Sequence, residues 1–276
     1  MSHSFKTRVA PGARLSPRRQ RGDTVMSGQQ EAVLHGELVE YREGETVCEG
    51  YVTWGRREDR RRPCVLLAHA WDGLNAPIRA KAEEFAALGY VCFAVDVYGK
   101  GVRGGVADDN SRLMGPLMED RALLRRRMVA GFEAALRHPL VDPERIVVIG
   151  YCFGGLCALD LARSAVPGLK AAVSFHGVLV PPRLGPQSSI TARVLILHGW
   201  EDPTSSKEDV LAVARELTEA GADWQLHAHG HAMHAFTYPG LHNPEAGLQY
   251  HPDAARRTWA AMRAFLDEVF VGAERR

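Results

Sequence analysis

Short apolar runs alternate along the chain with stretches of helical spacing. Runs rich in β-branched and aromatic residues predict buried strands at 63–69, 90–97, 145–149, 170–175 and 193–198, and a last strand is expected at 224–229. Between the strands, apolar residues at helical spacing predict helices at about 78–88, 116–137, 156–162, 207–220 and 252–270. This alternation is typical of a parallel sheet covered on both faces. The sequence therefore predicts an α/β fold with a doubly wound, mostly parallel sheet.

The segments outside this alternation predict an edge and a pocket. Residues 34–40 and 46–54 are strand-like and are separated by a Glu-Gly-Glu turn at 43–45, so we expect an antiparallel hairpin at one edge of the sheet. The long loops 98–115 and 178–191 are expected to shape a pocket at the ends of the strands.

Length and composition favour one globular domain. A chain of 276 residues with 46% hydrophobic residues can bury one large core, and we expect that domain to cover residues 31–276. Residues 1–30 carry six Lys and Arg side chains against the single acid Asp23 and show little periodicity, which predicts a disordered basic extension. An organellar transit peptide is the alternative, and Met26 offers a later start.

Charge and cysteine usage narrow the class of partner. The net charge of +1 with 24% charged residues gives no basic field for nucleic acid, so small molecules are the expected partners. No apolar run approaches the roughly 20 residues that span a bilayer, which argues against a membrane protein. Five scattered cysteines indicate a reducing compartment, and we expect a cytoplasmic protein. Nothing in the sequence indicates an oligomeric state.

The candidate chemistry begins at residues 150–155, Gly-Tyr-Cys-Phe-Gly-Gly, which join the apolar run 145–149 to the helical run 156–162. Gly-x-Cys-x-Gly between a strand and a helix is the nucleophile-elbow pattern with sulfur in place of the commoner serine oxygen. The helix N-terminus favours a thiolate at Cys152, and the N–H of Phe153 can point at a developing oxyanion. The alternative is a small buried cysteine beside a tight turn.

An acid and a base follow in the order that such a nucleophile needs. Asp202 comes after the strand 193–198, and His234 comes after the strand 224–229. Alone, Asp202 before Pro203 would be an ordinary turn residue. Together with Cys152, these two residues predict that the cysteine sulfur lies within about 4 Å of one ring nitrogen of His234 and that Asp202 contacts the other nitrogen.

Other histidines raise the question of a metal. Histidines are dense at His227, His229, His231 and His234, and the first three alternate, so one face of a strand could carry them and hold zinc. No carboxylate or cysteine stands at an obvious ligand spacing, so we expect no metal site. Three more histidines end predicted strands and receive no assigned role, namely His69, His176 and His198.

With these residues in place, the chain from about residue 34 to the last helix resembles the dienelactone hydrolase family of α/β-hydrolases. The resemblance rests on residues 150–155, on His-Gly-x-x-Asp-Pro at 198–203, on His-Ala-Phe at 234–236 and on Gly-Leu-Asn at 73–75. It implies an α/β-hydrolase fold and hydrolysis of a small-molecule ester or lactone, as by a carboxymethylenebutenolidase, without metal or organic cofactor. It also implies an acyl-enzyme formed by a triad of Cys152, Asp202 and His234, and an oxyanion hole from the N–H groups of Phe153 and Trp71.

Two positions depart from the family's type members. Ala70 stands where they carry a glutamate that helps to control the protonation of the cysteine, so His234 would have to activate the thiol alone. Tyr238 stands where they carry an arginine that binds the substrate carboxylate, and Lys100 is the candidate for that missing charge. The resemblance therefore implies the reaction class more firmly than the particular lactone.

Two other readings compete with hydrolysis. A ligand-binding protein whose catalysis has lapsed would fit the loss of the glutamate, but all three triad residue types are retained. The cysteine amidotransferase and DJ-1-like proteins also have a cysteine elbow. In the DJ-1-like group a histidine commonly follows the cysteine, whereas residue 153 here is Phe153.

Overall fold

The computed structural model describes residues 33–55 and 60–272, and these belong to one compact unit. The basic extension predicted for residues 1–30 lies outside the described residues. Within the described part, the largest element is an eight-stranded sheet, and the order of its strands is β1-β2-β4-β3-β5-β6-β7-β8. Its strands are β1 (Leu34–Glu43), β2 (Thr46–Gly55), β3 (Arg62–Ala68), β4 (Val91–Val95), β5 (Val141–Tyr151), β6 (Leu169–Phe175), β7 (Arg193–Gly199) and β8 (Trp224–His229).

The sheet is parallel from β4 to β8 and ends in the antiparallel hairpin β1–β2. The expected edge hairpin and the expected doubly wound sheet are both present. The parallel strands β3 to β7 carry buried apolar side chains on both faces, because helices cover each side. All carboxyl ends of the parallel strands meet at one edge, which is where β5 delivers Cys152.

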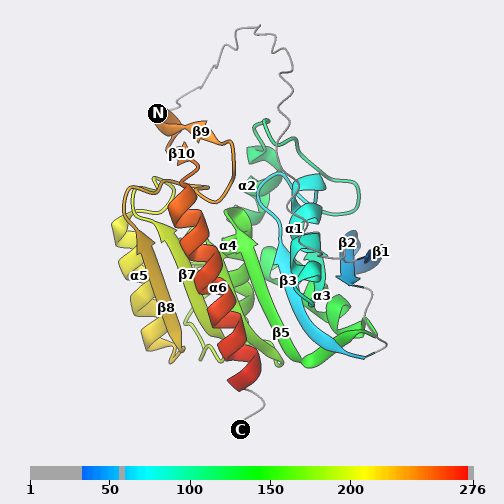
Figure 1. Cartoon of the computed structure of the whole chain (residues 1–276). Coiled ribbons are helices and arrows are strands. Elements are labelled where there is room, and N and C mark those ends of the chain that lie inside the picture. The colour runs from blue at the N-terminus through cyan, green and yellow to red at the C-terminus, as the bar shows by residue number, and fades with distance from the viewer. Residues whose placement is uncertain (1–32, 56–59, 273–276) are drawn as a thin grey trace, which may run out of the picture. The chain divides into compact units, whose positions relative to one another are not determined.

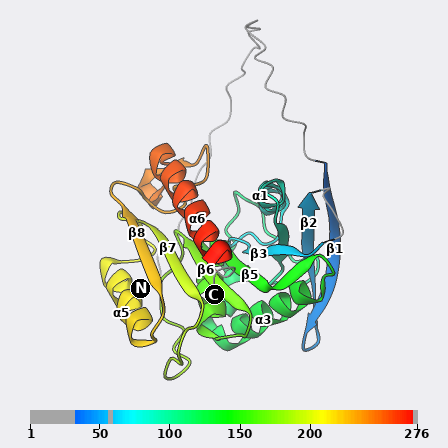
Figure 2. The same ribbon diagram turned by 60° about the horizontal axis from the view of Figure 1, so that its bottom comes forward.

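Helices form the outer layers (Figures 1 and 2). The helices α1 (Ala76–Ala87) and α6 (Pro252–Gly272) pack on one face of the sheet, and α3 (Arg121–Arg137), α4 (Phe153–Arg163) and α5 (Lys207–Glu219) pack on the other. A short hairpin, β9 (His242–Asn243) and β10 (Leu248–Gln249), follows the His234 loop, with a single turn of 3₁₀ helix at Pro244–Ala246 between its strands. The sequence pattern did not predict this hairpin.

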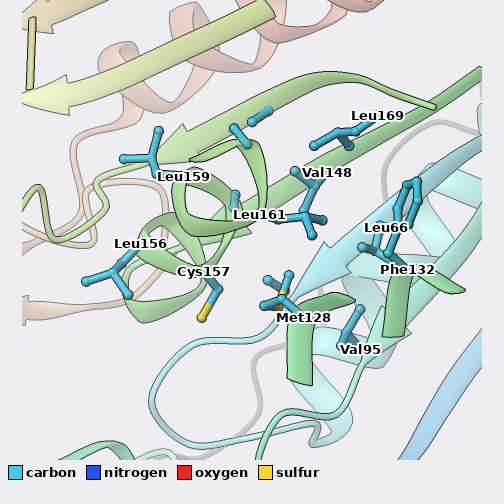
Figure 3. Close-up of a cluster of buried hydrophobic side chains, with 14 of the residues drawn as sticks. Leu66, Val95, Met128, Phe132, Val148, Leu156, Cys157, Leu159, Leu161 and Leu169 are labelled. Atoms are coloured by element: carbon cyan, nitrogen blue, oxygen red, sulfur yellow. The ribbon is translucent and has the colours of Figure 1, made fainter. Parts of the chain in front are cut away.

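The larger core lies between the sheet and the α3–α4 layer (Figure 3). Val148 of β5 and Leu161 of α4 are fully buried there, together with Met128 and Phe132 of α3. Complete burial of an apolar side chain of this size stabilises a fold by about 1.5–3 kcal/mol. The cluster therefore fixes β5 and α4, the two elements that flank the nucleophile position, against a rigid support.

One predicted helix was wrong in its extent. In place of a single helix at 116–137, the chain forms α2 (Ser111–Glu119) and α3, separated at Asp120. Asp120 leaves the helical conformation, with φ −109° and ψ 80°, and its side chain accepts a hydrogen bond from the N–H of Leu123 at the start of α3. This capping favours a new helix start over continuation. The expected loop 98–115 is accordingly shorter, because α2 begins at Ser111.

Candidate active site

The turn from β5 into α4 holds Cys152 in a strained conformation. Its φ is 56° and its ψ is −119°, and it is the N-cap residue of α4. Such backbone strain recurs at nucleophile elbows and other functional sites. A Cβ on Gly150 would lie 1.9 Å from the carbonyl oxygen of Gly154, and a Cβ on Gly154 would lie 2.2 Å from the carbonyl oxygen of Ala68. Glycine is therefore required at 150 for the tight turn from β5 into α4, and at 154 for α4 to begin so close to the end of β3.

The three side chains singled out from the sequence are brought together. The Sγ atom of Cys152 lies 3.0 Å from Nε2 of His234, and Nδ1 of His234 lies 2.7 Å from Oδ2 of Asp202. Both distances satisfy the geometric expectation. Asp202 and His234 are each 4% exposed, whereas Cys152 is only partly buried. Cys152 is thus the most exposed of the three residues.

Thr204 is a further contact that the sequence did not reveal. Its hydroxyl donates to Oδ1 of Asp202 at 2.6 Å and lies 2.9 Å from Nδ1 of His234, and its main-chain N–H donates to the same Oδ1 at 2.8 Å. Nδ1 of His234 must carry the proton, since it faces a carboxylate oxygen and a hydroxyl oxygen. The hydroxyl therefore bridges the acid and the base.

The charges in this chain of contacts shift two pKa values in opposite directions. Burial by itself lowers the pKa of His234, but the charge of Cys152 and the hydrogen bonds to Asp202 and Cys152 outweigh it and raise the pKa to about 10. Burial by itself raises the pKa of Asp202, but the hydrogen bonds from His234 and Thr204 outweigh it and lower the pKa. The arrangement therefore favours the protonated form of His234 beside the ionised carboxylate of Asp202.

These pKa shifts determine whether the stability of the fold rises or falls with pH. The pKa of His234 lies above its unfolded value of 6.5, so its protonation stabilises the fold fully below about pH 6.5. That stabilisation is lost as the pH rises through about 10. The pKa of Asp202 lies below its unfolded value of 3.8, so its contribution is present above that pH and is lost as the pH falls through the lowered pKa.

The two main-chain N–H groups expected to form an oxyanion hole belong to two segments that pack together. Phe153 is the first residue of α4, and Trp71 lies just past the end of β3, against whose last residue α4 is packed. Among the described residues, neither N–H donates to a main-chain carbonyl. Tyr98 donates its hydroxyl to the carbonyl oxygen of Trp71 at 2.8 Å, which holds the chain in place at this point.

The two positions that depart from the family pattern, Ala70 and Tyr238, differ from each other in exposure. Ala70 is half-buried, and the nearby carboxylate of Asp72 accepts a hydrogen bond from Asn75, the N-cap residue of α1. Tyr238 is 42% exposed in the loop after His234.

Lys100 is occupied elsewhere. Its ammonium pairs with the carboxylates of Glu40 and Glu49 on the edge hairpin, and the second of these distances is 3.3 Å. The charge of Lys100 is therefore already balanced at the hairpin, and its expected role in binding a substrate carboxylate is not supported.

The remaining histidines lie apart from any metal geometry. Among the described residues, no group of three or more His, Cys, Asp or Glu side chains could hold a metal ion. His231 lies beyond the end of β8, so it does not share a strand face with His227 and His229. His176 is buried, with its pKa lowered to about 3 by burial, then by the charge of His234, against which its ring packs edge-on at 5.3 Å.

A pocket of about 270 Å³ lies on the α1–α6 side of the elbow. Its lining includes Tyr151, Lys81 and Trp259, and the ammonium of Lys81 lies 5.3 Å from the Trp259 ring centroid. Cys152 is not among the lining residues, so we do not assign this pocket to the reacting group. Within the part of the chain that the structure describes, no helix is both long and apolar enough to cross a bilayer.

Comparison with known proteins gives a consistent picture. The dienelactone hydrolase family model matches residues 49–270. The solved structure titled m3DLH is 37% identical with a TM-score of 0.79, and the match covers 86% of this chain and 98% of that one. A dienelactone hydrolase-like promiscuous phosphotriesterase, P91 from metagenomic libraries, is 35% identical with the same TM-score and the same coverage.

Curated relatives agree with the structures. A protein of Aquifex aeolicus that carries the provisional name carboxymethylenebutenolidase is 25% identical over 228 residues, which is 81% of this chain and 94% of that protein. The family match spans the elbow, both loops that carry the acid and the base, and both layers of helices. The chain therefore belongs to the dienelactone hydrolase family of α/β-hydrolases, enzymes that hydrolyse esters and lactones.

Proposed function

We propose that this enzyme hydrolyses a small carboxylic ester or lactone through an acyl-enzyme on Cys152. The observation that carries the proposal is the unbroken chain of short contacts from sulfur to His234 at 3.0 Å and from His234 to Asp202 at 2.7 Å. A nucleophile joined to a base that a third group orients is the arrangement needed for nucleophilic catalysis. Membership of the hydrolase family favours this reading over the lapsed binding protein and over the amidotransferase-like enzymes.

The first half-reaction transfers the acyl group to sulfur. His234 holds the proton of the thiol on Nε2, and the thiolate attacks the acyl carbon, whose carbonyl π electrons move to oxygen. The N–H groups of Phe153 and Trp71 are proposed to stabilise that oxyanion. As the carbonyl re-forms, the bond to the alkoxide breaks and Nε2 gives its proton to the leaving oxygen. The products of this step are a thioester and an alcohol, which stays tethered to the acyl group when the substrate is a lactone.

The second half-reaction returns the thiol. Neutral His234 removes a proton from water, the hydroxide attacks the thioester carbon, and the same N–H groups stabilise the second oxyanion. The tetrahedral intermediate collapses, the carbon–sulfur bond breaks, and sulfur leaves as a thiolate that takes back the proton held on Nε2 of His234, while the carboxylic acid departs. Asp202 keeps the ring in the tautomer with the proton on Nδ1 and stabilises its positive form. Tyr238, exposed in the loop after His234, is proposed to contact the substrate from the rim of the site.

The test is a screen of the purified protein against aryl esters, aliphatic esters and lactones, with Cys152→Ala and Cys157→Ala in parallel. Cys157 lies on the same helix and is fully buried, so it controls for loss of a cysteine as such. We expect hydrolysis by the wild type and by Cys157→Ala, and a loss of at least about a thousandfold in Cys152→Ala. Hydrolysis at the wild-type rate by Cys152→Ala would refute the proposal. Binding without turnover in the wild type would favour the lapsed binding protein.

A second candidate activity is hydrolysis of phosphotriesters. The observation that favours it is the 35% identity to a structure whose title describes a promiscuous phosphotriesterase. The same thiolate could attack phosphorus, displace an aryloxide and leave a phosphorylated sulfur for water to attack. Turnover of a diethyl aryl phosphate would support this activity, and a single stoichiometric release of the phenol would show that the phosphorylated enzyme is a dead end.

A further inference from the structure

His69 is a buried histidine that the proposed reaction does not use directly. It follows the last residue of β3 and is 1% exposed. The N–H of Val97 donates to Nε2 of His69 at 3.3 Å, so Nε2 is unprotonated and Nδ1 carries the hydrogen. Nδ1 then donates to the carbonyl oxygen of Ala70 at 2.7 Å. Burial lowers the pKa of His69, in keeping with this neutral form.

The carbonyl that His69 binds belongs to the peptide that carries the N–H of Trp71. A peptide group is planar and trans, so its C=O and its N–H point in opposite directions and turn together. A strong hydrogen bond to the carbonyl of Ala70 therefore fixes the direction of the Trp71 N–H. The N–H of Gly73 donates to the same carbonyl at 3.2 Å, and the Tyr98 hydroxyl holds the next carbonyl, that of Trp71.

The ring of His69 also packs against the other side of the proposed oxyanion hole. Its centroid lies 4.7 Å from the ring of Tyr98 and 6.4 Å from the ring of Phe153. The main chain of His69 abuts the start of α4, because a Cβ on Gly154 would lie 2.7 Å from the carbonyl oxygen of His69. His69 thus contacts both segments whose N–H groups are proposed to converge on a single oxygen.

We propose that His69 is a positioning residue that aims the Trp71 N–H into the oxyanion hole through its hydrogen bond to the Ala70 carbonyl. The proposal rests on the proposed acyl-transfer function. It assigns no contact between His69 and the substrate, and it requires the neutral ring with the proton on Nδ1. Loss of that donor should weaken stabilisation of the oxyanion while leaving the sulfur and its base intact.

Two variants isolate the hydrogen bond. In His69→Asn the side-chain amide nitrogen can take the place of Nδ1 and donate to Ala70, whereas His69→Leu fills the site without a donor. Both variants lose Nε2, the acceptor for the N–H of Val97, and this loss is therefore the same in the two variants. Removal of an oxyanion donor costs on the order of 10²–10³ in kcat, and a misdirected donor should cost less. We expect kcat for an aryl ester to fall roughly 10–100-fold in His69→Leu with little change in KM, and His69→Asn to stay within severalfold of wild type.

Alkylation of Cys152 by iodoacetamide separates this role from a general structural one. Displacement of iodide builds no oxyanion, so both variants should be alkylated at the wild-type rate. Full activity in His69→Leu, equal losses in the two variants, or a parallel fall in alkylation would each overturn the proposal. Failure of the proposed function has a different signature, because wild-type protein would then show no hydrolysis, or hydrolysis that survives Cys152→Ala.

A measurement on the unmodified protein covers the case in which His69→Leu does not fold. Nitrogen-15 NMR of the wild type at neutral pH should show a His69 ring protonated at Nδ1 and unprotonated at Nε2. The opposite tautomer could not donate to the Ala70 carbonyl, and finding it would refute the proposal without any variant.

Discussion

Replacing Thr204 by valine tests whether its hydroxyl helps the acid and the base to work together. Valine keeps the β-branched shape and the main-chain N–H that donates to Asp202, and it removes only the hydroxyl. Two contacts are lost, the 2.6 Å donation to Asp202 and the 2.9 Å contact with Nδ1 of His234. Because Thr204 is itself exposed, the change should leave the fold intact.

The size of the effect follows from these contacts. A hydrogen bond to a charged group contributes about 1.5–3 kcal/mol, but the exposure of Thr204 and the remaining 2.8 Å bond from its N–H reduce the expected loss to about 1 kcal/mol. Since about 1.4 kcal/mol is tenfold in rate, a loss of about 1 kcal/mol should lower kcat/KM roughly fivefold. The hydroxyl also helps to lower the pKa of Asp202, so the pKa of Asp202 should rise in the variant.

The assay is kcat/KM for an aryl ester as a function of pH, with Thr204→Ser as the matched control. Serine retains the hydroxyl and should stay close to wild type. Thr204→Val should show a lower plateau of kcat/KM across pH, and its melting temperature should equal that of wild type. If the serine and valine variants were equally impaired, the methyl group and not the hydroxyl would matter, and the bridging role would be refuted. Wild-type kinetics in Thr204→Val would refute it as well.

Three further outcomes are expected. Because the pKa of His234 is raised to about 10, kcat/KM should fall as the pH rises through about 10. The melting temperature of wild type relative to that of Cys152→Ala should decline between pH 6.5 and 10. A difference in melting temperature that stays constant with pH would contradict the interaction of His234 with Cys152. Ala70 stands where the family's type members carry a glutamate that helps to control the protonation of the cysteine, so Ala70→Glu should slow alkylation by iodoacetamide at mildly acidic pH. An unchanged rate would show that this position does not influence the sulfur. In Gly154→Ala the new methyl would lie 2.2 Å from a carbonyl oxygen, so the melting temperature should drop by about 5 °C or more. Gly115 lies inside α2 with nothing within 4 Å, so Gly115→Ala should leave the melting temperature unchanged or raise it slightly.

The elbow and the order of the acid and the base could be predicted because their signals are local. A buried strand, a Gly-x-Cys-x-Gly turn and a helix are contiguous in the sequence, and this juxtaposition places Cys152 at the carboxyl end of the sheet. Asp202 and His234 each follow a strand of the same parallel sheet, so their side chains must meet at that edge. Periodicity, the elbow motif and the position of each residue after a strand were together sufficient for these features.

Contacts between distant segments could not be predicted in this way. Lys100 is 60 residues from Glu40 in sequence, and only the position of the edge hairpin shows that their charges pair. Thr204 resembles any turn residue after Asp-Pro until the His234 loop is folded back onto it. The break between α2 and α3 was missed because apolar spacing continues across Asp120, while its capping side chain ends one helix and begins the next.

The central claim is that an acyl group passes through the sulfur of Cys152, and mass spectrometry of quenched enzyme tests it most directly. Wild-type protein mixed with excess p-nitrophenyl acetate and quenched in acid within the first turnover should carry one acetyl group, located on the peptide that contains Cys152. The same treatment should leave Cys152→Ala unlabelled and Cys157→Ala labelled. An acetyl group found on another side chain in wild type, or full turnover by Cys152→Ala, would contradict the account.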